Sequence, residues 1–138
     1  MQKVKAFLAN FVMGLIIFMA IDVIWIYALA KPVYVEILGH YLHDNIFSSH
    51  LYLGSILGVY ILLIIGLLVY VLPKSFSLSY TKTFWLGALY GLIIYGVFAL
   101  TNFSTLNIWS IKLVFVDMIW GAIICGLLAL ILKRFAFR

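Results

Sequence analysis

Two apolar stretches of the chain carry the same short motif, in which an aspartate precedes a tryptophan by three residues. Asp22 and Trp25 form the motif near the N-terminus, and Asp117 and Trp120 form it in the last apolar stretch. Residues three apart on a helix lie on the same side, so each carboxylate would stand beside an indole ring. A carboxylate in the hydrocarbon of a bilayer costs about 2.5–3.5 kcal/mol and therefore has to face protein or water. The repeated motif predicts a polar site inside a membrane protein.

A pair of carboxylates can serve several kinds of chemistry. Two close carboxylates repel each other when both are charged, so Asp22 and Asp117 are expected to hold a proton between them. Such a pair suits proton relay, cation binding or a polar substrate, and Trp25 and Trp120 would form aromatic walls for a flat or cationic ligand. The alternative is structural. Each aspartate would then accept a hydrogen bond from an indole or from Asn102, and Trp25 would anchor the chain at the membrane interface.

The composition is that of an integral membrane protein. Of the 138 residues, 67% are hydrophobic and only 9% are charged, whereas a soluble domain is about half apolar and about a quarter charged. The net charge of +5 is not gathered in one polar patch, so it does not indicate nucleic-acid binding. The single cysteine, Cys125, lies inside an apolar stretch and excludes a disulfide framework.

Four stretches are long and apolar enough to cross a hydrocarbon core about 30 Å thick. They are approximately residues 4–30, 51–72, 83–101 and 108–132. Lys31 and Pro32 are expected to end the first, and Pro73 and Lys74 to end the second. Backbone groups in hydrocarbon need partners within their own segment, so each stretch is predicted to be a helix. The sequence predicts one all-α transmembrane domain, a bundle of four helices.

The positive charges indicate the orientation of the bundle. When both termini are cytoplasmic, only Lys31 and Lys112 among the lysines and arginines lie outside. The seven inside are Lys3, Lys5, Lys74, Lys82, Lys133, Arg134 and Arg138. Residues 28–30 imitate a signal-peptidase site, but the preceding apolar stretch exceeds the about 7–15 residues of a signal peptide, and no cleavage is expected. Lys112, five residues before Asp117, is an alternative ion partner for that aspartate.

This orientation places the two aspartates at one depth. Asp22 follows Lys5 by 17 residues on the outward first span, and Asp117 precedes Lys133 by 16 residues on the inward fourth span. At about 1.5 Å per residue, both carboxylates lie roughly 25 Å from the cytoplasmic charges, toward the outer leaflet. Asn102, at the end of the third span, lies about one turn higher. A polar layer built from spans one, three and four is therefore predicted.

Small and polar residues form stripes at helical spacing on the same three spans. Small residues on a stripe let two helix backbones approach closely, so these stripes are predicted to be packing faces. The stripes are Asn10, Gly14, Asp22 and Trp25; Gly87, Gly91, Tyr95, Ala99 and Asn102; and Asp117, Gly121 and Cys125. Helix packing is also the expected role of Gly54 and Gly58 in the second span.

The longest connection, residues 31–50, carries four potential metal ligands. Glu36, His40, His43 and Asp44 are spaced by four, three and one residues and would share one face of a helix. A metal site needs three or four such ligands converging, so these are weak candidates. The alternative is the polar face of a short amphipathic helix that lies on the outer membrane surface or dips into it.

Three motifs together give the chain a family resemblance. They are Asp22-x-x-Trp25, the stretch Tyr95-Gly96-Val97-Phe98-Ala99-Leu100-Thr101-Asn102, and Asp117-x-x-Trp120-Gly121. The chain resembles, over nearly its whole length, a family of small four-span bacterial membrane proteins catalogued only as a domain of unknown function. The resemblance implies a four-helix fold and a bacterial inner-membrane location, but no activity. Phe98 and Ala99 replace a tyrosine and an aspartate of the usual third motif, so chemistry that used that acid would not transfer.

The function predicted first is binding or transport of a small molecule or ion, with a proton-linked aspartate pair in the outer half of the bundle. The residues expected to bind ligand or proton are Asp22, Asp117, Trp25, Trp120, Asn102 and Tyr95. Two alternatives stay open: a membrane enzyme acting on lipid or redox substrates at the outer interface, and a non-catalytic accessory subunit. The cofactor is unknown. The expected partners are the lipid bilayer, a second copy of the chain and a small molecule or ion, but not nucleic acid.

Overall fold

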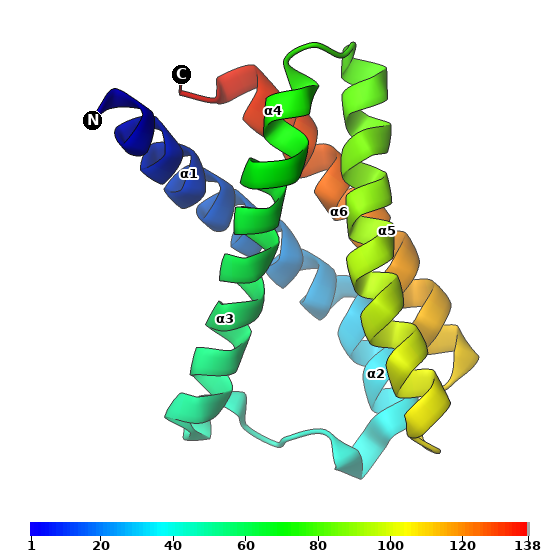
Figure 1. Ribbon diagram of the computed structural model, residues 1–138. Coiled ribbons are helices and arrows are strands. Elements are labelled where there is room, and N and C mark those ends of the chain that lie inside the picture. Colours follow the sequence, from blue (N-terminus) through cyan, green and yellow to red (C-terminus); the bar gives the residue numbers. More distant parts are fainter. Residues whose placement is uncertain (138) are drawn as a thin grey trace.

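The computed structural model describes residues 1–137, apart from the side chain of Ile46, and the regular structure among these residues is helical. Four of its helical runs are long and apolar enough to cross a membrane, which confirms the predicted all-helical fold. The runs are Gln2–Tyr41, His50–Ser75, Tyr80–Thr105 and Ile111–Phe135. Figure 1 shows both chain ends at the same end of the bundle, called here the terminal end. The opposite end is called the loop end.

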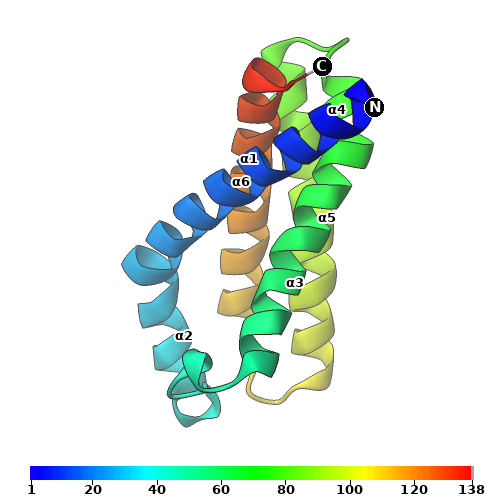
Figure 2. The same ribbon diagram turned by 90° about the vertical axis from the view of Figure 1, so that its left-hand side faces the viewer.

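The first run does not end at Lys31 and Pro32 as expected. Helix α1 (Gln2–Trp25) leads through a π-helical turn, η1 (Ile26–Ala30), into α2 (Lys31–Leu38), which has the proline in its first turn. A proline has no backbone N–H to donate, and the widened turn before it accommodates that loss without ending the helix. The chain bends there, so α1 crosses the bundle obliquely while α2 turns toward the loop end (Figure 2).

The second run also contains a π-helical turn followed by a proline. Helix α3 (His50–Gly66) continues through the π-helical turn η4 (Leu67–Val71) into the short helix α4 (Leu72–Ser75), which has Pro73 in its first turn. Ser49 caps α3 by accepting a hydrogen bond from the backbone N–H of Leu51. In Figure 1, α3 stands apart from α5 toward the loop end and approaches it toward the terminal end.

Helices α5 (Tyr80–Thr105) and α6 (Ile111–Phe135) form the most extensive helix pair, and serines cap both at their N-termini. Glycine makes this approach possible. A methyl group added at Gly91 would overlap the carbonyl oxygen of Gly121, and one at Gly87 would overlap the carbonyl oxygen of Cys125. The stripes predicted on these two spans therefore pack against each other.

Helix α1 packs through one narrow stripe. Asn10, Gly14, Phe18 and Asp22 are its buried residues, four positions apart. The stripe expected from the sequence contained three of these and also Trp25, which is half-buried. At the terminal end, the Asn10 side chain donates to the carbonyl oxygen of Phe137 (2.9 Å) and accepts from the N–H of the same residue (2.8 Å). This double hydrogen bond attaches the end of the chain to α1.

Gly54 and Gly58 do not pack as predicted. A methyl group added at either position would meet nothing within 4 Å among the described residues, because the first half of α3 leans away from the other helices.

The sequence assigned seven lysines and arginines to one side of the membrane. Those that the structure describes lie at or near the terminal end, on the first turns of α1 and α5, on α4 and at the end of α6. Arg138 lies outside the described residues.

Candidate functional site

Asp22 joins three helices through its two carboxylate oxygens. The residue is 8% exposed. Its Oδ1 accepts a hydrogen bond from the indole Nε1 of Trp120 on α6 (2.9 Å), and its Oδ2 accepts one from the hydroxyl of Tyr60 on α3 (2.7 Å). A buried carboxylate is stable only with such donors, and here each oxygen has one. Asp22 therefore fixes α1 against α3 and α6.

The two tryptophans of the repeated motif stack on each other. The rings of Trp25 and Trp120 have their centroids 4.3 Å apart and are inclined by only 3°. The hydrogen bond of Trp120 goes to Asp22 on the other helix, not to Asp117 in its own motif. The two copies of the motif thus interlock across α1 and α6, which holds both rings in a defined place.

Asp117 is only half satisfied. Its side chain is on α6 and the residue is 7% exposed. Its Oδ1 accepts a short hydrogen bond from the hydroxyl of Tyr34 on α2 (2.5 Å). Its Oδ2 is buried and has no hydrogen-bond partner among the described residues. The Tyr34 ring is itself positioned edge-on against Trp109, at 6.0 Å between centroids.

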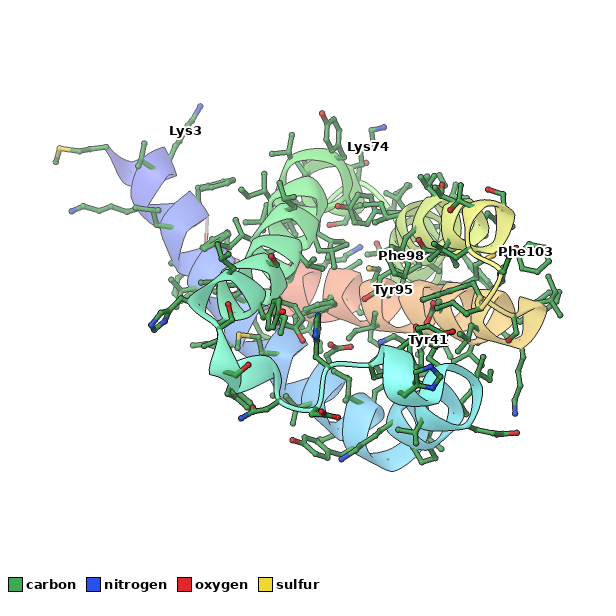
Figure 3. All side chains as sticks on the ribbon, turned by 90° about the horizontal axis from the view of Figure 1, so that it is seen from below. Lys3, Tyr41, Lys74, Tyr95, Phe98 and Phe103 are labelled. Atoms are coloured by element: carbon green, nitrogen blue, oxygen red, sulfur yellow. The ribbon has the colours of Figure 1, made fainter. Side chains whose placement is uncertain are left out.

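Both aspartates line one cavity of about 480 Å³, a volume within the range of small-molecule sites. Helix α2 forms one wall because the chain bends at η1 and turns α2 away from the line of α1, toward the loop end. Figure 3, a view along the bundle, places Tyr95 of α5 on the inner side of that helix. The lining of this aspartate cavity is Asp22, Trp25, Ile26, Ala30, Lys31, Tyr34, Leu42, His43, Tyr95, Asp117 and Trp120.

The structure thus brings together five of the six expected binding residues and leaves out Asn102. That asparagine is half-buried near the end of α5, does not line the cavity, and makes no side-chain hydrogen bond among the described residues. Lys112 does not pair with Asp117, which was the alternative that the sequence left open. Its ammonium group pairs with Glu36 at 3.2 Å on the surface, and Asp117 forms no ion pair within the part of the chain that the structure describes.

Sequence reasoning missed Tyr34 and Tyr60, the two hydroxyl donors to the carboxylates. Tyr60 stands in the middle of an apolar span, where a buried tyrosine needs an acceptor for its hydroxyl, and this was an available signal. Tyr34 gave no such signal because residues 31–50 were expected at the membrane surface. Only the continuation of the helix past Pro32 carries Tyr34 to Asp117.

The weak metal candidates are not brought together. Helix α2 ends at Leu38, and Gly39 takes a positive φ of 47° that only glycine adopts readily, so the assumed single face is broken before His40. His40 packs on Tyr41, and His43 stacks on Tyr52 of α3 at 4.1 Å. No group of three or more potential metal ligands converges among the described residues.

Comparison with known proteins agrees with the fold. Residues 7–132 match the model of a family described as predicted membrane proteins, DUF2177. The chain belongs to this family. The match covers nearly the whole chain, which confirms the resemblance to a family of membrane proteins of unknown function. No curated protein and no solved structure matched the chain.

Proposed function

We propose that this DUF2177 protein binds a small molecule or ion that carries a positive charge or a hydrogen-bond donor, and that it exchanges a proton when it does so. The observation that carries the proposal is the buried Oδ2 of Asp117, which lines a cavity and has no partner among the described residues. A buried carboxylate oxygen left without a donor is costly, by about 1–3 kcal/mol or more for a charged group. A proton or a cationic ligand removes that cost.

The two aspartates have different roles in this proposal. Asp22 already accepts hydrogen bonds at both oxygens and acts as a fixed negative wall that orients Trp120. Asp117 has the free acceptor and is the ligand group. The stacked pair of Trp25 and Trp120 lines the same cavity and would favour a cation by contact with the aromatic faces.

Binding is expected to depend on pH because a proton and a cationic ligand compete for the same carboxylate. The other titratable groups on the cavity wall are Asp22, Lys31, Tyr34, His43 and Tyr95. Affinity for a cation should therefore rise with pH, since a protonated Asp117 no longer attracts positive charge. Loss of the carboxylate should remove this dependence.

The test uses ethylammonium chloride as a probe. The purified protein in detergent is titrated at several pH values and the fluorescence of its tryptophans is recorded, with sodium chloride at equal ionic strength as reference. Asp117→Asn should lower the affinity by about tenfold or more, as expected for a charge-assisted hydrogen bond. Asp44→Asn is the matched control, because that acid is exposed and does not line the cavity. Equal binding by the wild type and Asp117→Asn at every pH would contradict the proposal.

A second candidate function, a non-catalytic accessory subunit, is favoured by one observation. Both oxygens of Asp22 are used to join α1, α3 and α6, which is the behaviour of a structural group. In that case Asp22→Asn and Asp117→Asn would lower the yield of folded protein, and no probe would bind. The form of the enzyme hypothesis in which Glu36, His40, His43 and Asp44 hold a metal has less support, because no three potential metal ligands converge among the described residues.

The location of the site follows from the proposed orientation. We infer a bacterial inner-membrane protein with both termini in the cytoplasm, supported by the positive residues gathered at the terminal end. The aspartate cavity would then face the outer leaflet. Transport through so small a bundle would need a second copy, and the open face at Gly54 and Gly58 offers a helix surface on which another copy could pack.

A further inference from the structure

The aspartate cavity adjoins an apolar groove between α1 and α3. This α1–α3 groove has a volume of about 570 Å³ and shares three wall residues, Asp22, Ile26 and Tyr95, with the aspartate cavity. Its remaining walls are apolar or aromatic and include Val23 on α1 and Val59 on α3, which are about half exposed. A polar pocket that shares a wall with an apolar groove within a membrane-spanning bundle matches a molecule with a polar head and an apolar chain.

The charges of the aspartate cavity describe the head of that molecule. Two carboxylates and one lysine, Lys31, lie on its wall. The carboxylates outnumber the lysine, so a head that is only anionic would be repelled, whereas an ammonium group would satisfy the free Oδ2 of Asp117. Lys31 would pair with a negative group on the same head. The ammonium must carry N–H donors, because a quaternary ammonium cannot donate to that oxygen.

We propose that the occupant is a membrane lipid whose head carries both a primary ammonium and a phosphate, an ethanolamine-type phospholipid. Its ammonium would donate to Asp117, its phosphate would face Lys31, and one acyl chain would lie in the α1–α3 groove. This inference rests on the proposed function, because it names the ligand class of the same site. A soluble amine shares the ammonium chemistry of the head, but it has no apolar chain that could fill the α1–α3 groove.

The test measures which lipid reaches the tryptophans. The Trp85→Phe/Trp109→Phe variant retains only Trp25 and Trp120, both on the cavity wall. It is reconstituted in three sets of vesicles, and each set contains the same fraction of one lipid with brominated chains. The sets differ only in the head group of that lipid, which is ethanolamine, choline or glycerol. Quenching of the tryptophan fluorescence is recorded for each set. The ethanolamine lipid should associate about threefold or more strongly than the choline lipid.

Three variants check the assignment within that background. Asp117→Asn should abolish the preference for the ethanolamine head. Val23→Phe should reduce quenching by all three lipids because the added ring occupies the groove. Ile24→Phe is the matched control, since Ile24 is exposed on α1 and does not line the groove. Its fluorescence should be quenched to the same extent as that of the variant with only Trp25 and Trp120.

Equal quenching by the three head groups, or an unchanged preference in Asp117→Asn, overturns the inference. If ethylammonium still binds in an Asp117-dependent way, the proposed function stands and only its lipid source is wrong. If neither probe binds, both fail. Should the tryptophan variant fail to fold, native mass spectrometry of the wild type from an equal mixture of the three lipids decides the same question, because retention of all three lipids in equal amounts overturns the inference.

Discussion

Replacing Trp120 by phenylalanine should break the central contact between the two motifs. The change removes the indole N–H that donates to Asp22 Oδ1 at 2.9 Å and keeps an aromatic ring to stack on Trp25. Tyr60 still donates to the other oxygen of Asp22, so the carboxylate loses one of its two donors. The loss should appear as a lower free energy of unfolding, with the helices still formed.

The structure bounds the size of this effect. A hydrogen bond to a charged group contributes about 1.5–3 kcal/mol in soluble proteins, whereas those between membrane helices average about 0.6 kcal/mol and reach about 1.7 kcal/mol. Asp22 and Trp120 are both at most 9% exposed, so water does not replace the lost donor easily. We therefore expect a coupling energy of about 1–2 kcal/mol between the two side chains.

A double-mutant cycle measures that coupling. Wild type, Trp120→Phe, Asp22→Ala and the double variant are unfolded with increasing dodecyl sulfate in mixed micelles and followed by far-ultraviolet circular dichroism. Asp22→Asn retains one acceptor oxygen and should lie between wild type and Asp22→Ala. A second cycle with Trp25→Leu and Trp120→Leu should give about 0.5–1.5 kcal/mol for the stacked rings.

A coupling below about 0.5 kcal/mol between Asp22 and Trp120 would be within the error of additivity. The hydrogen bond would then not join α1 to α6, and the interlocked motifs could not explain how the cavity wall is held. A fall in stability for Trp120→Phe that is equally large in the Asp22→Ala background would point to packing alone.

The remaining predictions concern the scaffold and the surface. Gly91→Ala should lower the free energy of unfolding by about 1–3 kcal/mol because its methyl group would overlap a carbonyl oxygen of α6, whereas Gly54→Ala, with open space around it, should not; detergent unfolding compares the two. Asn10→Ala should release the last residues of the chain and cost about 1–3 kcal/mol, seen as faster hydrogen exchange at Phe137. Glu36→Gln should change stability by less than about 1 kcal/mol at low salt, because its ion pair is exposed, and high salt should remove the difference.

Much of the fold could be predicted because it depends on local patterns. Each apolar stretch is long enough to span a bilayer, and backbone groups there have no other partners, so helices follow from length alone. The stripe of Asn10, Gly14 and Asp22 gave the buried face of α1, and the glycines of α5 gave its packing face. The predicted end of the first helix at Lys31 and Pro32 was wrong, because a proline after a π-helical turn bends a helix without ending it.

The candidate site divides in the same way. The sequence by itself determined that the two carboxylates, each with an indole three residues further on, lie at nearly equal distances of 17 and 16 residues from the lysines at the terminal end, and so belong to one layer of the bundle. Only the tertiary structure decided which groups meet within that layer. The crossed bond from Trp120 to Asp22, the hydroxyl of Tyr34 on Asp117 and the absence of Asn102 from the cavity wall depend on how far each helix is rotated and tilted. Rotation and tilt are set by contacts between residues far apart in the chain, and periodicity within one helix carries no information about them.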